Sequence, residues 1–202
     1  MTKIVRALQI ALVAGLILAA IGRAQAQGMD MSRYGGPVYS GAPALSVTAS
    51  LVSAGGGAAD FSIATALTSM VGSKLVTAEV GKLTKQYGSD KVTSWMNVFN
   101  YAVGDALKIA TAKGISLPAG NLSGQALASA LVTAGLDKDG TFYTEYMLDH
   151  AVSHAIHCQV MDDIDAKFGG DADTNYHAVT NQAMYDLAQA LGVKQVKLSS
   201  FH

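Results

Sequence analysis

The chain has 202 residues, of which 15 are acidic, 14 are basic and one is cysteine. A near-neutral chain lacks the basic footprint that nucleic-acid binding requires, so we expect no nucleic-acid partner. The single cysteine, Cys158, excludes an internal disulfide. Half of the residues are hydrophobic, and a chain of this length can bury a substantial core in one domain.

Residues 1–26 have the pattern of a secretory signal peptide. Lys3 and Arg6 precede an apolar run over 7–21, and small residues at 24 and 26 match the positions that a signal peptidase reads. The run is shorter than the ~20 residues of a membrane-spanning helix, so we expect cleavage after Ala26 rather than an uncleaved anchor. Cleavage removes three of the 14 basic residues and leaves 11 against 15 acidic ones, a net charge of −4. The prediction is an exported, periplasmic chain whose mature part does not span the membrane.

Residues 27–43, "QGMDMSRYGGPVYSGAP", predict an extended segment, because a glycine pair and two prolines interrupt any regular helix. One interpretation is a disordered tail. The other is an N-terminal arm that binds a partner through Tyr34, Val38 and Tyr39, since tyrosine is enriched at protein interfaces. Trp95, farther along the chain, is a further candidate for a partner-binding anchor.

From residue 44 to 202 the pattern is helical, and it predicts one bundle domain. Apolar residues recur at steps of three and four in several segments, which is the spacing of one helix face. The predicted helices are 43–53, 61–87 with Asp60 as N-cap, 89–114 with Ser89 as cap, 122–134, 142–168, and a last helix that begins at the cap Asp173 and reaches Leu191. The tail, 194–202, is expected to be extended. Four long amphipathic helices joined by short breaks predict an all-α fold: a four-helix-bundle-like domain with extra short helices and the extended N-terminal arm.

The stretch 145–163, "EYMLDHAVSHAIHCQVMDD", contains three of the five histidines. In a helix, His150, His154 and His157 lie within about 60° of one another and share the apolar face. Two interpretations remain open. The histidines are packed in a core or an interface with their ring nitrogens hydrogen-bonded, or they form a mononuclear metal site to which His177 adds a ligand from the last helix.

A ferritin-like di-metal centre is disfavoured. Such a centre needs glutamates on two helices and a Glu-x-x-His motif on each of two others. The mature chain contains only Glu79 and Glu145, and neither has a histidine three residues later. We also find no nucleophile motif, phosphate loop, dinucleotide fingerprint or Cys-x-x-Cys-His haem motif, so the sequence predicts neither catalysis nor a cofactor in this chain itself.

Two resemblances to known proteins follow from longer stretches. The segment "YMLDHAVSHAIH", after the loop "AKGISLP", is similar to the exported ferritin-like bundles of unknown function. Tyr185 and Asp186 stand near the place of the later histidine of those proteins, which disfavours a shared metal role.

A closer resemblance covers nearly the whole mature chain. It is carried by "GGPVYSGAPALSVTASLVSAGG", "FSIATALTSMVG", "LDKDGTFYTEYMLDH" and "QVMDDIDAKFG…NYHAVTNQAMYDLAQALG". These stretches resemble the small third subunit of the membrane-bound, quinone-dependent alcohol dehydrogenase of acetic acid bacteria.

The resemblance implies a complex on the periplasmic face of the cytoplasmic membrane. Its large subunit holds pyrroloquinoline quinone (PQQ), calcium and haem c and oxidises ethanol, and its triheme cytochrome c subunit passes electrons to ubiquinone. The small subunit bears no redox group and stabilises the large one, so no catalytic residue is carried over. We therefore expect a non-catalytic accessory subunit, and the alternative is a stand-alone periplasmic metal- or cofactor-binding bundle.

Overall fold

The computed structural model describes residues 42–136, 141–142, 154–193 and 196–198. Helices dominate this part of the chain, so the predicted all-α class is confirmed. The helices are α2 (Ala42–Ala54), α3 (Ile63–Val71), α4 (Ser73–Tyr87), α5 (Ser89–Ala112), α6 (Gly124–Gly135), α8 (His154–Phe168) and α9 (Ala172–Ala190), and the strands are β1 (Thr141–Phe142) and β2 (Lys197–Leu198). The predicted signal peptide and nearly all of the arm lie outside the described residues. The bundle begins at Ala42, two residues earlier than predicted.

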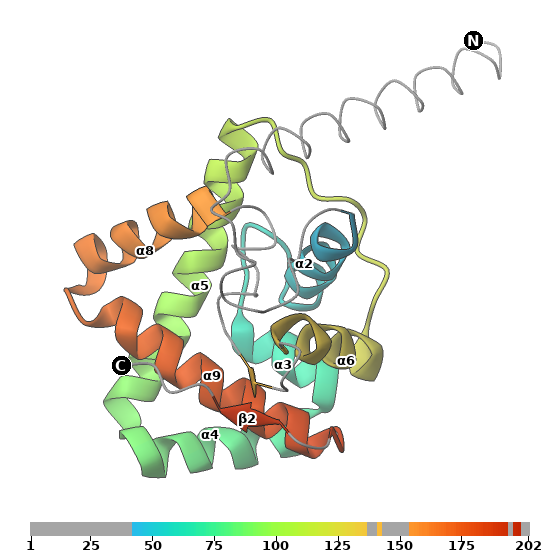
Figure 1. Ribbon diagram of the computed structural model, residues 1–202, viewed down its shortest axis with the longest axis vertical. Coiled ribbons are helices and arrows are strands. Elements are labelled where there is room, and N and C mark those ends of the chain that lie inside the picture. Colours follow the sequence, from blue (N-terminus) through green and yellow to red (C-terminus); the bar gives the residue numbers. More distant parts are fainter. Residues whose placement is uncertain (1–41, 137–140, 143–153, 194–195, 199–202) are drawn as a thin grey trace, which may run out of the picture.

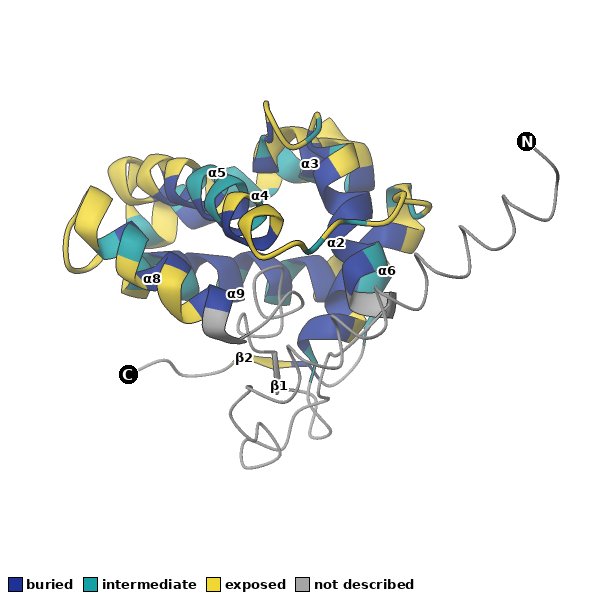
Figure 2. Ribbon diagram, turned by 90° about the horizontal axis from the view of Figure 1, so that it is seen from above, coloured by how far each residue is buried: buried dark blue, intermediate teal, exposed yellow. Residues whose placement is uncertain are grey.

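Helix α5 is the central element of the bundle. It packs against α3, α4, α8 and α9, while α2, α3 and α6 pack on one another. Figure 1 shows α8 on one side of α5 and the group α2, α3 and α6 on the other. The apolar residues whose spacing predicts this helix are all buried except Met96; the buried ones are Val92, Trp95, Phe99, Val103, Ala106 and Ile109. Figure 2 shows the buried faces of the helices turned toward a shared interior, with exposed residues on the outer faces.

An aromatic cluster fills the centre of the core. The ring of Phe99 lies 6.1 Å from that of Trp95, 5.5 Å from that of Tyr176 and 6.4 Å from that of Phe61. The indole Nε1 of Trp95 donates a hydrogen bond to Thr180 Oγ1 at 2.8 Å, which joins α5 to α9. Trp95 is only 2% exposed, so the prediction that it serves as a partner-binding anchor is wrong. Its apolar area and its single donor are both used inside the bundle.

The predicted helix over 61–87 is in fact two helices. Gly72 separates α3 from α4 with φ +86° and ψ 152°, a backbone conformation that favours glycine. The N-cap is Ser62 rather than Asp60, because the Ser62 hydroxyl accepts a hydrogen bond from the Thr65 amide at 3.3 Å. The spacing of apolar side chains carries no information about backbone φ angles, so it did not predict the break at Gly72.

Other helix boundaries also differ from the predictions. Gly88, with φ +89°, precedes α5, and Ser89 is the first helical residue rather than the cap. Asp171 is the N-cap residue of α9, and Asp173 lies in its first turn. An acidic side chain there interacts favourably with the positive end of the helix dipole.

The third long helix was predicted to begin at Phe142, but this residue lies in β1. There it pairs in parallel with Leu198 of β2. The described part of that helix begins at His154, and residues 143–153 lie outside the description. The expectation of an extended tail is confirmed for Lys197–Leu198. Within the described ranges, no helix has the length and hydropathy that a membrane crossing requires.

Candidate functional site

The structure brings His157 of α8 against His177 of α9. Their ring centroids are 5.7 Å apart, and the rings meet edge to face at 68°. His157 is buried at 8% exposed, on the same face as the buried Ile164, so its predicted place on the apolar face is confirmed. His150 lies outside the described residues. His154 is the first residue of α8, but its side chain is not described.

His177 is oriented by its own helix. Its Nδ1 lies 2.9 Å from the carbonyl oxygen of Asp173, one turn earlier in α9. A carbonyl only accepts, so Nδ1 carries the proton in this contact. The ring also meets the ring of Tyr176, with centroids 5.3 Å apart. In the part of the chain that the structure describes, no cluster of three or more His, Cys, Asp or Glu side chains is arranged to hold a metal ion.

The structure describes only some of the other residues that the sequence analysis singled out. Cys158 is exposed on α8. Tyr34, Val38 and Tyr39 lie outside the described residues, and their partner-binding role stays a prediction.

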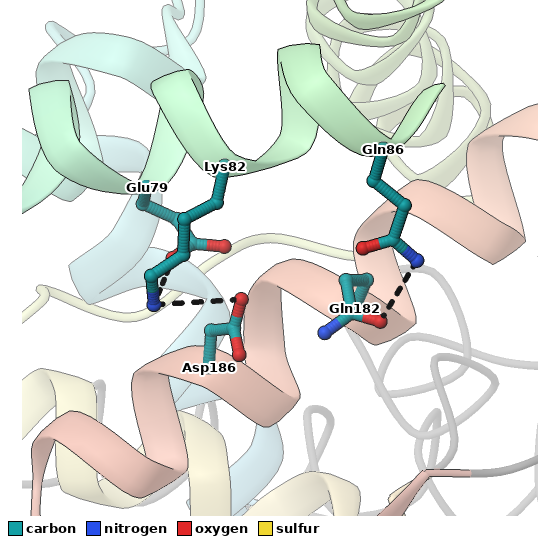
Figure 3. A network of polar contacts seen from close by, with 5 residues as sticks. All are labelled: Glu79, Lys82, Gln86, Gln182 and Asp186. Carbon is teal, nitrogen blue, oxygen red and sulfur yellow. Dashed lines mark hydrogen bonds and ion pairs between the residues drawn. The ribbon is translucent and has the colours of Figure 1, made fainter.

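A second polar cluster, which the sequence analysis missed, joins α4 to α9 (Figure 3). Lys82 Nζ lies 3.4 Å from Glu79 Oε2 and 3.8 Å from Asp186 Oδ2. One turn along, Gln86 Nε2 donates to Gln182 Oε1 at 3.4 Å. The sequence does contain a signal for it: the polar residues are three, four or seven apart within each helix, which places them on one face. Only the packing of α4 on α9 shows that the two faces meet.

The Glu79 carboxyl in this cluster is an unusually weak acid. Its pKa is raised from an ordinary value of 4.5 to about 7, chiefly by burial and secondly by its hydrogen bond to and repulsion from Asp186, while Lys82 acts in the opposite direction. Glu79 Oε1 is buried, and the described residues offer it no hydrogen-bond partner. The carboxyl is therefore substantially protonated at neutral pH.

A cavity of about 110 Å³ lies beside this cluster, among α3, α4, α5 and α9. Apolar side chains from all four helices form most of its wall, and Glu79, Lys82 and Asp186 supply charged groups to it. Leu75 lines the cavity and is 48% exposed, so the cavity reaches the surface of the protein at this side chain. A concave apolar space with a few convergent polar groups is the usual form of a small-molecule site.

A similar pair of acids joins α5 to α8. The pKa of Asp105 is raised by burial first and by its hydrogen bond to and repulsion from Asp163 second, and Lys108 and Lys167 oppose the shift. Asp105 Oδ2 is buried without a hydrogen-bond partner among the described residues. Lys167 Nζ also lies 4.8 Å from the ring centroid of Tyr101. Because the pair connects two packed helices, we assign it to helix packing.

We expect the raised pKa of Glu79 to make the protein less stable as the pH rises. The folded-state pKa of about 7 exceeds the ordinary 4.5, so the stabilisation is complete below about pH 4.5 and is lost as the pH rises through about 7. The full shift corresponds to about 3 kcal/mol, and partial solvent screening reduces it to about 1–2 kcal/mol. Urea unfolding at pH 5 and pH 8 measures the loss.

The variant Glu79→Gln should remove that part of the pH dependence, because an amide does not titrate. Asp162→Asn changes an exposed acid on α8 and is the matched control. An unchanged difference between pH 5 and pH 8 in Glu79→Gln would contradict the assignment to this residue.

Comparison of the chain with protein-family models, curated proteins and solved structures finds no match. The family resemblance therefore remains a prediction from the quoted stretches. The structure adds two features to this prediction. One is the contact of His157 with His177, and the other is the polar cluster of α4 and α9 beside the cavity.

Proposed function

We propose that the chain is a non-catalytic accessory subunit of a periplasmic, quinone-dependent alcohol dehydrogenase. It would bind and stabilise the large subunit, which holds PQQ, calcium and haem c and oxidises ethanol. The triheme cytochrome c subunit of the same complex would pass the electrons to ubiquinone. The observation that carries this proposal is the resemblance of four long stretches, spread over the mature chain, to the small subunit of that enzyme.

The use of reactive side chains in the described residues supports this proposal. His157 and His177 contact each other between α8 and α9. Glu79, Lys82 and Asp186 connect α4 to α9. These contacts join helices to one another and stabilise the bundle, as a subunit that supports a partner requires.

A pull-down from membranes tests the proposal. The mature chain, tagged at its C-terminus, should recover a large haem-bearing dehydrogenase subunit, and deletion of residues 27–39 should abolish the recovery. Recovery of no haem protein by the intact chain would refute the proposed function.

Tyr39→Ala tests the arm within that complex. We expect it to weaken affinity for the large subunit by about 2 kcal/mol, or about 30-fold, because aromatic anchors dominate interface energies. Tyr39→Phe is the matched control, since it keeps the ring and removes only the hydroxyl. Unchanged affinity in Tyr39→Ala would exclude this residue as an anchor without affecting the pull-down result.

The second candidate function is a stand-alone periplasmic metal- or cofactor-binding bundle. The contact between the His157 and His177 rings favours it, because His154 precedes His157 by about one turn of α8. Metal content and a visible spectrum of the isolated mature chain distinguish the two functions. One metal ion per chain, lost in His157→Ala, would favour the metal-binding bundle.

A further inference from the structure

We propose that the cavity among α3, α4, α5 and α9 binds a small neutral aliphatic molecule that has one hydrogen-bonding head, such as a hydroxyl group. This inference does not rest on the proposed function, because it follows from the size, lining and charge of the cavity.

The size of the cavity limits the ligand to a few heavy atoms. Its volume is about 110 Å³. An apolar cavity of about 150 Å³ in another protein stays dry and binds benzene, which has six carbon atoms. The present cavity therefore suits a body of about four to six heavy atoms.

The cavity exists because α4 is only partly covered by its neighbours. Leu83 is the one buried residue of this helix, while Val76 and Val80 are half-buried and Leu75 is 48% exposed. The break at Gly72 contributes, because it ends α3 and starts α4 as a separate helix instead of continuing one apolar face. The space beside these side chains is therefore a consequence of how the helices meet.

The wall of the cavity favours an apolar body. Most of its lining residues are aliphatic or aromatic, and their side chains offer water few hydrogen-bond partners. Apolar lining residues include Leu67 of α3, Val80 and Leu83 of α4, Phe99 of α5, and Ala183 and Met184 of α9. An aliphatic chain placed here would gain dispersion contacts with this apolar wall.

The charged groups at the cavity favour a neutral head. Lys82 and Asp186 carry opposite charges, and Glu79 retains a proton up to about pH 7, so together they are close to neutral. No charged side chain of α3 or α5 lines the cavity, and the Tyr87 hydroxyl, whose pKa is raised by burial and by Asp186, stays neutral. Glu79, Lys82 and Asp186 line the cavity and supply the polar groups to which the head of the ligand can hydrogen-bond.

Titration with 1-pentanol at pH 6, followed by NMR of the side-chain methyl groups of the full mature chain, tests the proposal. We expect saturable shifts and intermolecular nuclear Overhauser effects at Leu75, Val80 and Met184, which lie around the cavity. Pentylammonium and pentanoate should bind at least about tenfold more weakly, because burial of an unpaired charge is costly. Shifts that do not saturate, or that involve methyl groups elsewhere, would overturn the proposal.

Variants locate the ligand independently of the spectra. Ala183→Leu places a larger side chain in the cavity and should abolish pentanol binding, whereas Ala166→Leu on the exposed face of α8 should leave it unchanged. At pH 8.5 Glu79 is ionised and the site is negatively charged. The affinity for pentylammonium should therefore rise relative to the affinity for pentanol in the wild type, but not in Glu79→Gln. Persistent pentanol binding in Ala183→Leu, or the same change in preference in Glu79→Gln, would contradict this site.

Discussion

Replacing Trp95 by alanine should lower the free energy of unfolding by about 3–5 kcal/mol. Trp95 is 2% exposed, and its ring contacts that of Phe99 in the core. Truncation leaves a cavity at the centre of the bundle and leaves the Thr180 hydroxyl without the indole donor. Chemical denaturation followed by circular dichroism measures the loss.

Two further α5 variants separate the contribution of aromatic packing from that of the hydrogen bond to Thr180. Trp95→Phe keeps most of the aromatic packing but removes the donor to Thr180, so it should cost about 1–3 kcal/mol. Ser94→Ala, at the exposed neighbouring position, should change stability by less than about 0.5 kcal/mol. A loss below about 1 kcal/mol in Trp95→Ala would mean that this side chain is not in the core.

Gly120→Ala should destabilise the protein by about 2–3 kcal/mol through a steric clash. A Cβ atom at this position would lie 2.7 Å from both the Cα and the N of Ser50, and 2.8 Å from the carbonyl carbon of Ala49. These are backbone atoms of α2, so no change of rotamer relieves the contact. The Leu122 amide donates to Ser50 Oγ at 3.1 Å, which keeps this loop close to α2.

Gly81→Ala is the matched control for that substitution, and it should act in the opposite direction. Gly81 lies inside α4, and a Cβ there meets nothing within 4 Å. Alanine is favoured over glycine in a helix, so we expect a gain of about 0.5–1 kcal/mol. Equal stabilities of the Gly120→Ala and Gly81→Ala variants would contradict the close approach of the loop to α2.

Some features of the candidate sites could be predicted from the sequence. The helical period alone placed His157 on an apolar face, and the structure confirms this. The metal-site interpretation named His177 beside this row, but the helical period could not establish the contact of His157 with His177, because that contact depends on how α8 packs against α9. The same limit applies to the Glu79 carboxyl, whose pKa is raised chiefly by burial and secondly by Asp186, because both effects depend on how α4 packs against α9.

The sequence by itself determined the all-α class and most of α5, because the 3.6-residue repeat of apolar side chains is a local property of the chain. Tertiary structure decided the burial of Trp95, which depends on Phe99 and Thr180 around it. It also decided the cavity beside α4, because an empty volume arises only where the faces of several helices fail to fill the space between them.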